Sequence, residues 1–409
     1  MRELFAKLLE ERKESVDYMT GQITRICRDL PPRSPGSEGE KAAAAYLAKE
    51  LRGNCGCDEV RTESFCERPG AFYGYLYFSA ALDVLCALSF FIAPWLSLLF
   101  GIAAILLMLF QFILYRQVVD PFFPEKQGTN VTAVRRSRAK PRRRVFFNGH
   151  IDAAWEWPVN YYLGGVAYAV HVVLTIVGVV FYCVLAVLRI LGAGAWVRTA
   201  ALCGLAFIPF WVGLVFLWDR RRVVDGANDD LSGCMMGMAL LRALNKSGVR
   251  LEDTEVGVIL TGSEEAGLRG AKAWCAAHGG EYRDVPTYIF SYDTIHDPRF
   301  LMTNERDLNG TVRSDRALSA LFLRAAGEVG VPCRRGWVPP MGGATDSAAF
   351  THGGFRSVGI TGLSHKLEPY YHTRRDSYDN LNAEGLENCY AATVRTLELI
   401  EGGALEDGD

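Results

Sequence analysis

A chain of 409 residues with a formal net charge of −2 has no excess of positive charge, and it carries no nucleic-acid-binding motif, so we exclude that class. Half of the residues are hydrophobic but unevenly placed: residues 71–115 contain one charged residue and residues 161–218 contain two. Outside these two apolar blocks, about 300 residues of ordinary composition remain, which is enough for one large α/β domain.

The segment before the first apolar block is predicted to be mostly helical. Charges run throughout residues 1–13, so this stretch lacks the apolar core of a signal peptide. Residues 4–30 place apolar side chains near helical spacing, and Ser37 can cap a second helix over residues 38–51. Residues 58–65 alternate enough to form a strand, so we expect the helices to lead into a sheet.

Each apolar block is long enough to cross a lipid bilayer twice. A spanning helix needs about 20 apolar residues at a rise of ~1.5 Å each. The first block supplies residues 73–92 and 95–115 around Pro94, and the second supplies 162–190 and 196–217. Tyr and Trp at several ends fit the interfacial aromatic belt. Four such lengths disfavour buried helical pairs in a soluble core, so the sequence predicts an integral cell-membrane protein with two transmembrane hairpins.

Two ionisable residues, Asp83 and His171, lie within the predicted membrane spans. Ionisable groups inside a membrane are candidates for function. Packing and hydrogen bonding between helices explain them equally well, so both interpretations stay open.

Basic residues favour one side of the predicted membrane. Both hairpins begin and end on the side of the polar domain, which carries Arg116, the basic run 135–144 and residues 220–222. The opposite loops carry Arg189 and Arg198. The positive-inside rule therefore predicts a cytoplasmic polar domain, and eleven scattered cysteines without zinc-finger spacing agree with a reducing compartment. The basic run is expected to form a hairpin tip, either solvated or in contact with anionic headgroups.

Strand and helix patterns alternate in the polar part of the chain. The patterns predict strands at residues 128–134, 145–149, 255–261, 285–292 and 355–361, and helices at 233–244, 266–277, 315–329 and 382–401. The first two of these strands are expected to pair with each other. The alternation is typical of an α/β fold with a mixed, mostly parallel sheet sandwiched between helices.

Polar stretches stand at the strand ends or in the loops after them. They are residues 148–152, 225–230, 264–265, 291–293 and 370–373. A lone histidine beside a strand is usually structural, but five groups of His, Asp and Glu at successive strand ends are difficult to attribute to chance. Open α/β sheets bind their ligands at the carboxyl ends of strands. Two histidines with several carboxylates suit zinc, with cobalt or manganese as alternatives.

These stretches resemble the motifs of the di-zinc exopeptidases, the MH-clan zinc peptidases that include bacterial leucyl aminopeptidases and glutamate carboxypeptidase-like enzymes. The shared motifs are Gly-His-x-Asp, Gly-Ala-x-Asp-Asp-x-Ser-Gly, Glu-Glu-x-Gly-Leu-x-Gly, an Asp that ends a strand and a late Tyr-His-Thr. The resemblance implies the zinc-exopeptidase fold, into which the two transmembrane hairpins predicted above are inserted. It divides the chain into catalytic segments 1–70, 117–160 and 219–409 and hairpins 71–116 and 161–218.

The resemblance implies two bound divalent metal ions, with zinc as the first choice. Carried over position by position, it makes five residues the metal ligands: His150, Asp229, Glu265, Asp293 and His372. One ion would be held by His150, Asp229 and Asp293. Asp229 would bridge to the second ion, which Glu265 and His372 complete.

The resemblance also assigns two catalytic residues. Asp152 is expected to orient the imidazole of His150. Glu264 is expected to be the general base, taking a proton from a water that the two metal ions share. The family further implies a cis peptide between Asp229 and Asp230, and a cleft-lining loop at residues 341–350.

The resulting prediction is a membrane-embedded, zinc-dependent aminopeptidase that hydrolyses peptide substrates. The alternatives are a carboxypeptidase or dipeptidase, a glutaminyl cyclase-like acyltransferase, and a non-catalytic membrane scaffold. All five candidate ligands are present, which argues against the scaffold. Arg374 and Arg375 are either binders of a substrate carboxylate or surface charges. Because the second hairpin lies between His150 and Asp229, we expect the cleft to lie close to the membrane surface.

Overall fold

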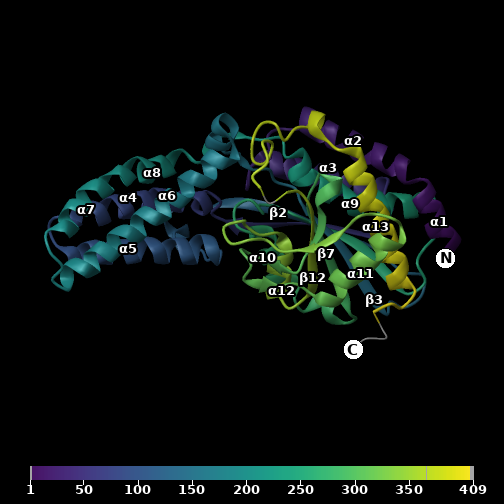
Figure 1. Cartoon of the computed structure of the whole chain (residues 1–409). Coiled ribbons are helices and arrows are strands. Elements are labelled where there is room, and N and C mark those ends of the chain that lie inside the picture. Colours follow the sequence, from purple (N-terminus) through teal and green to yellow (C-terminus); the bar gives the residue numbers. More distant parts are fainter. Residues whose placement is uncertain (1, 365, 406–409) are drawn as a thin grey trace.

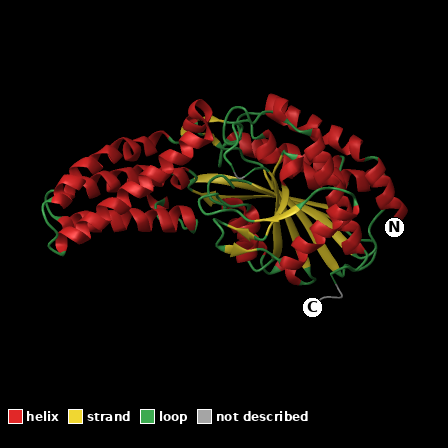
Figure 2. Ribbon diagram, viewed as in Figure 1, coloured by secondary structure: helices red, strands yellow, loops and turns green. Residues whose placement is uncertain are grey.

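A mixed sheet of eight strands forms the centre of the polar part of the chain in the computed structural model, which describes residues 2–364 and 366–405 (Figure 2). The strands in spatial order are β1 (Glu59–Glu67), β2 (Lys126–Arg135), β6 (Thr254–Thr261), β3 (Arg143–His150), β7 (Thr287–Ile295), β12 (Arg356–Gly362), β8 (Leu301–Asn304) and β11 (Arg334–Gly336). The central strands β6, β3, β7 and β12 run parallel, whereas β1, β2 and β8 join through antiparallel pairs. The prediction of a mixed, mostly parallel sheet is confirmed.

Helices cover both faces of this sheet (Figures 1 and 2). Successive side chains of a strand point to opposite faces, so Phe147 packs into one hydrophobic cluster and Phe146 into the other. The first cluster includes α1 (Arg2–Glu10), α2 (Arg12–Asp29), α3 (Glu38–Gly53), α9 (Ser232–Lys246), α11 (Arg316–Glu328) and α13 (Ala383–Glu401). The second includes α10 (Arg269–His278) and α12 (Asp346–His352). Two short ribbons, β4 (Trp155–Glu156) with β5 (Asp219–Val223) and β9 (Arg306–Asp307) with β10 (Val312–Arg313), complete the strands.

The two apolar blocks form a helical bundle that projects from one side of the α/β part (Figure 1). Its members are α4 (Gly70–Phe90), α5 (Pro94–Met108), α6 (Pro158–Ile190), α7 (Trp196–Gly204) and α8 (Ile208–Gly213). By length and composition, four stretches could cross a membrane: Gly70–Phe90, Pro94–Ile113, Pro158–Ile190 and Trp196–Phe216. Gly164, whose φ of 82° is not helical, separates the first six residues of α6 from the rest of the helix. These stretches match the four predicted spans.

The bundle and the α/β part share one hydrophobic cluster. Tyr73 of α4 and Trp218 after α8 pack in the same cluster as Phe146 of β3 and Trp274 of α10. The Tyr73 ring stacks on Trp218 with centroids 5.4 Å apart. The bundle is therefore continuous with the core of the sheet.

The predicted pairing of residues 128–134 with 145–149 is wrong. β6 lies between the two strands, antiparallel to β2 and parallel to β3. The eight residues of β6 are all buried, as an apolar strand in the middle of a sheet requires. Sequence neighbours usually pair, but here a strand from much later in the chain takes the central position.

The basic run 135–144 does not form a hairpin tip. It connects β2 to β3 past β6, and Arg135, Arg143 and Arg144 are buried. Arg144 pairs with Glu255 at 2.6 Å and Asp284 at 2.9 Å. This run also lies at the amino end of β3, about 23 Å along the strand from its carboxyl end, and the bundle leaves the sheet at the carboxyl edge (Figure 1). Contact of the run with headgroups around the bundle is therefore excluded by the fold.

Candidate metal centre

The five predicted metal ligands converge at the carboxyl edge of the parallel strands. His150 ends β3, Asp293 lies near the end of β7, and Glu265 follows β6. Asp229 lies in the turn before α9, and His372 lies in the loop between β12 and α13. Potential ligand atoms gather within 4.8 Å of one another in three groups, namely His150 with Asp229 and Asp293, Asp229 with Glu265 and His372, and His150 with Glu264 and Glu265. The first two groups are the two ligand sets predicted from the sequence.

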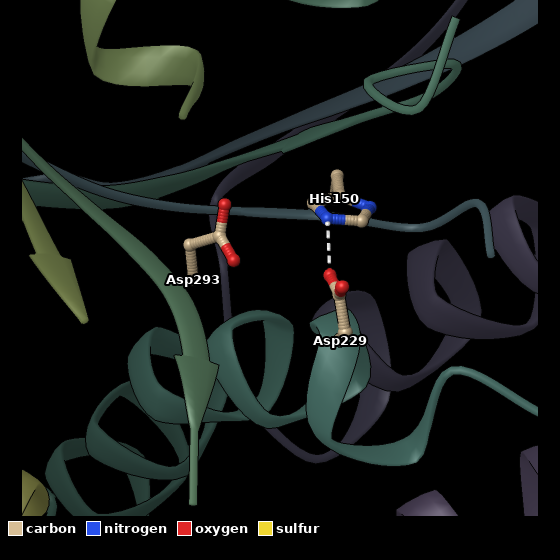
Figure 3. Close-up of side chains that lie close together, drawn as sticks. All are labelled: His150, Asp229 and Asp293. Carbon is tan, nitrogen blue, oxygen red and sulfur yellow. Dashed lines mark hydrogen bonds and ion pairs between the residues drawn. The ribbon is translucent and has the colours of Figure 1, made fainter. Parts of the chain in front are cut away.

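The Asp229 carboxylate lies between the two histidines. Its Oδ1 is 3.2 Å from Nε2 of His150 and its Oδ2 is 3.2 Å from Nε2 of His372. Figure 3 shows the contact with His150 and the Asp293 carboxylate facing the same space. The peptide bond between Asp229 and Asp230 is cis, as expected. One carboxylate therefore has each oxygen directed at a different imidazole, which is the arrangement of a bridging ligand.

Asp152 connects His150 to the loop that carries the two glutamates. Its Oδ1 lies 3.3 Å from Nδ1 of His150. The same carboxylate accepts hydrogen bonds from the backbone N–H groups of Glu264 at 3.0 Å and Glu265 at 3.1 Å. Asp152 is fully buried. It therefore lies where it can orient the imidazole, and it also holds the glutamate loop, which the sequence did not indicate.

The glutamate loop has a fixed backbone before α10 begins. Helix was predicted from residue 266, but α10 starts at Arg269 because Gly267 and Leu268 have positive φ values of 96° and 60°. Lys272 donates a hydrogen bond to the Gly267 carbonyl at 2.8 Å and to the Tyr115 carbonyl at 2.9 Å. The turn that presents Glu264 is therefore held from α10 and from the end of the first hairpin.

Sequence reasoning missed the roles of two further carboxylates. Asp376 accepts hydrogen bonds from the backbone N–H groups of Asn228 at 2.8 Å and Asp229 at 3.1 Å. Asp230 accepts from the backbone N–H of His150 at 3.0 Å. Both carboxylates hold the backbone of candidate ligands. Asp376 follows His372 by four positions, and this short spacing was its one signal in the sequence.

His372 is also packed from the bundle side. The centre of the Trp157 ring lies 4.4 Å from that of the His372 imidazole, and the backbone N–H of Trp157 donates to the His372 carbonyl at 2.8 Å. Arg374 donates to both oxygens of the buried Glu156 carboxylate at 2.6 Å. Because Trp157 immediately precedes α6, the start of an apolar helix touches a candidate metal ligand.

Burial and crowding shift the pKa values of the central carboxylates. Burial raises the pKa of Glu264 well above its usual value; the adjacent Glu265 carboxylate adds to the rise, while His150 opposes it. Burial likewise raises the pKa of Asp293 to about 7, with a further rise from Asp229. Burial alone would raise the pKa of Asp229, but its hydrogen bonds to His150 and His372 outweigh burial and hold that pKa low.

This donor set fits a divalent metal ion. Buried carboxylates at such density repel one another unless a cation compensates them, and two imidazoles with carboxylates are zinc ligands in proteins. Among the described residues, Oε1 of Glu265 has no hydrogen-bond partner, although Nε2 of His372 lies 3.3 Å away. The Nδ1 atom of His372 likewise has none. A bound cation, or a group next to it, would provide partners for these two atoms.

A cavity of about 440 Å³ adjoins the candidate ligands. Asp229, Glu264 and His372 line one part of it, and residues 339–344 and the loop after β12, including Lys366, line another. Residues of the bundle line most of the remainder. The candidate metal centre therefore opens toward the bundle. The closeness of the cleft to a membrane surface stays a prediction.

Comparison with known proteins supports this interpretation. Residues 218–397 match the model of peptidase family M28. No curated protein matches the chain.

The fold is similar to that of several solved structures. The LapA aminopeptidase of Legionella pneumophila has 14% identity and a TM-score of 0.54, over 97% of this chain and 73% of its own. The zinc aminopeptidase of Bacillus subtilis and the glutaminyl cyclase of Fimbriiglobus ruber each have 14% identity and a TM-score of 0.56, over 94% of this chain and 95% of theirs. At these identities the likeness concerns the fold. With the M28 match over residues 218–397, it confirms the predicted resemblance of this chain to the MH-clan zinc exopeptidases.

Proposed function

We propose that the protein is a membrane-embedded, zinc-dependent exopeptidase that acts as an aminopeptidase. The observation that carries this proposal is the position of Asp229, with one carboxylate oxygen 3.2 Å from each of two imidazoles. Asp293 and Glu265 each complete a group around one end of that carboxylate. The match to peptidase family M28 agrees with a hydrolase.

In this proposal each side chain has a distinct task. His150, Asp229 and Asp293 would hold one zinc ion, and Asp229, Glu265 and His372 the other. Bound zinc supplies Lewis-acid polarisation of the scissile carbonyl and acidifies water. Glu264 lines the cavity next to the ligands. It takes the proton of the attacking water and returns it to the nitrogen of the leaving amine.

The surroundings of Arg374 and Arg375 argue against either arginine as the binder of a substrate carboxylate. A carboxypeptidase needs a cation for the substrate's terminal carboxylate, but both ends of the Arg374 fork are engaged by Glu156. Arg375 is exposed, and its guanidinium lies 4.5 Å from the centre of the Tyr161 ring. Neither arginine is among the residues that line the cavity, and Lys366 is the one lysine or arginine among the described lining residues.

The proposal is tested with the purified full chain in lipid nanodiscs and a mixed peptide library, with and without a chelator. We expect loss of amino-terminal residues, abolished by the chelator and restored by zinc. Glu264→Gln should lack activity, whereas Glu384→Gln, an exposed position on α13, should behave as the parent. Chelator-insensitive hydrolysis or an active Glu264→Gln variant refutes the mechanism. Peptides that stay intact under every metal favour the non-catalytic scaffold.

A glutaminyl cyclase-like reaction is the second candidate, because one of the similar folds is a glutaminyl cyclase. Peptides with amino-terminal glutamine separate the two reactions: the cyclase releases ammonia and leaves a pyroglutamyl peptide, whereas the aminopeptidase releases glutamine. The participation of Asp229 in two ligand groups favours two ions per chain, which metal analysis of the purified protein measures.

We also propose that the catalytic part faces the cytoplasm. Arg116 and residues 220–222 flank the bundle next to the sheet, whereas Arg189 and Arg198 lie at its other end. This asymmetry follows the positive-inside rule without the basic run 135–144. A reporter fused after the last residue should be active in the cytoplasm; a signal on the other side would reverse the assignment.

A further inference from the structure

One cavity joins the candidate metal centre to the interior of the helical bundle. Its polar end is formed by the carboxylates and His372, and the remainder is formed mainly by residues of α4, α5 and α6. Its volume of about 440 Å³ lies within the range of pockets that hold small-molecule ligands. The cavity therefore extends the site instead of forming a separate pocket.

The cavity is long in the direction of the bundle axis. On each of three helices, the lining residues run from the end nearest the sheet toward the bundle interior: Tyr73 to Asp83 on α4, Phe112 back to Ala104 on the α5 stretch, and Tyr168 to Val179 on α6. At 1.5 Å per helical residue, these runs correspond to a depth of about 15 Å. Because the lining residues reach a similar depth on all three helices, they surround one elongated space.

The far end of this space is closed by tight packing. Ala104 and Val179, the deepest lining residues of α5 and α6, belong to a buried cluster with Cys86, Phe90 and Tyr182. At Gly101, in the same layer, an added Cβ would lie 2.3 Å from Sγ of Cys183. Because α4, α5 and α6 also contact one another in pairs, the space between them has room for a chain and not for a further helix.

The wall is apolar along most of its length. Leu76, Met108, Val172 and Ile176 are typical lining residues. Two polar groups of α4 interrupt the wall near the far end: the hydroxyl of Ser79, which is 7% exposed, and the carboxyl of Asp83, which is 3% exposed. Oγ of Ser79 and Oδ1 of Asp83 have no hydrogen-bond partner among the described residues. A water molecule in this part of the cavity would supply a hydrogen-bond partner for both groups.

We propose that the physiological substrate is an amide that bears a single long alkyl chain, with the scissile bond at the metal centre and the chain in the cavity between α4, α5 and α6. This inference rests on the proposed hydrolase function and names its substrate class. A chain dissolved in the bilayer reaches a cavity between membrane helices without crossing water. Hydrolysis consumes one water, breaks the C–N bond and releases a carboxylate and an amine, one of which keeps the chain.

Two series of substrates test the proposal with the full chain in nanodiscs. The N-acyl-leucines carry the alkyl chain on the acyl side of the amide, and the leucyl-alkylamides carry it on the amine side. In each series the chain grows from two to twelve carbons in steps of about two carbons. In one series we expect kcat/KM to rise by up to about fourfold per methylene, the effect of burying a methylene, and to level off where the chain meets the far end. The responsive series tells which product keeps the chain. Rates that do not depend on chain length in either series overturn the proposal.

A matched pair of variants on α5 locates the chain. Ala104→Phe fills the far end and should lower the ratio of long-chain to short-chain kcat/KM by about tenfold, the effect of roughly two methylenes. Ala103→Phe makes the same change at the next position, which does not line the cavity, and should keep the parent's ratio. Because each ratio is taken within one variant, general damage to folding cancels. An equal loss for all chain lengths in Ala104→Phe contradicts the proposal.

Photolabelling tests the chain position independently of hydrolysis. The probes are one long-chain N-acyl-leucine and one long-chain leucyl-alkylamide, each with a diazirine at the far end of its chain. We expect labelled peptides around Asp83, Ala104 and Val179. Labelling confined to the exposed outer positions Leu99 and Leu106 refutes the proposal. Labelling at the far end without hydrolysis of any amide supports the chain site and refutes the peptidase function.

Discussion

Replacing Asp152 by asparagine tests how the candidate site is held together. In the structure, one carboxylate accepts the backbone N–H groups of Glu264 at 3.0 Å and Glu265 at 3.1 Å, while its Oδ1 lies 3.3 Å from Nδ1 of His150. Asparagine substitutes an amide NH₂ for one of the two oxygens. The backbone N–H of Glu264 or of Glu265 then faces the N–H of the asparagine amide, so that one hydrogen bond is lost.

The expected magnitude follows from that lost hydrogen bond. A hydrogen bond to a charged group contributes about 1.5–3 kcal/mol, so an equilibrium that depends on it should shift by about 10- to 100-fold. This equals the range seen when partners that orient metal ligands are replaced. Because Asp152 does not belong to any of the three ligand groups, we expect Asp152→Asn to weaken zinc binding without abolishing it.

The assay is a titration of activity and bound zinc against buffered free zinc. We expect the midpoint of Asp152→Asn to lie 10- to 100-fold higher in free zinc than that of the parent. The control is Asp17→Asn, the same change at an exposed position on α2. An unchanged midpoint would show that the His150 imidazole and the glutamate loop are held without this carboxylate, and would refute the reasoning.

Three further changes address the base, a buried acid and the packing of His372. Glu264→Gln should lower kcat by about 10²- to 10⁴-fold, the usual contribution of a general base, with zinc content unchanged. Burial raises the pKa of Glu67 to about 7. Between about pH 4.5 and 7 the folded state therefore keeps a proton on this carboxyl that the unfolded state has released. The stability that this proton contributes is fully present below about pH 4.5 and is lost as the pH rises through 7. Glu67→Gln should therefore match the parent in thermal unfolding at pH 5 and exceed it at pH 8, by up to roughly 3 kcal/mol. Glu156→Gln weakens the clamp on Arg374 and should lower zinc affinity by up to about tenfold, through His372.

Each of these expectations has its own contrary result. Loss of zinc from Glu264→Gln would make that residue a ligand and not the base. A stability difference for Glu67→Gln that is equal at pH 5 and pH 8 would place its pKa near the ordinary value. Parental zinc affinity in Glu156→Gln would show that Trp157 alone suffices to hold the His372 loop.

The candidate ligands could be predicted because their signals are local. His150 and Asp293 follow apolar strands directly, and Glu265 stands between a strand and a helix. Parallel strands bring such positions to one edge whatever their order in the sheet. Errors in strand order, such as the expected pairing of β2 with β3, therefore leave the predicted site intact.

Features that depend on distant partners could not be predicted. Asp376 holds the backbone of Asn228 across 148 positions of sequence, and its short spacing from His372 does not indicate which backbone groups it binds. The middle of the basic run 135–144 is solvated, but its last residue, Arg144, is buried and pairs with Glu255, which lies 111 positions later in the sequence. The cavity is lined from several helices at once, so no single stretch of the sequence encodes it.

The position of β6 in the sheet has a consequence for biosynthesis. β1 emerges from the ribosome before the first hairpin, and β2 and β3 emerge between the hairpins, yet β6, which separates β2 from β3, follows the second hairpin. Domains generally fold as units during translation, but here the central ladder stays incomplete until all four apolar helices have been made. The four candidate membrane spans are therefore complete before the sheet can close, and the nascent chain must keep two unpaired strand edges protected until then.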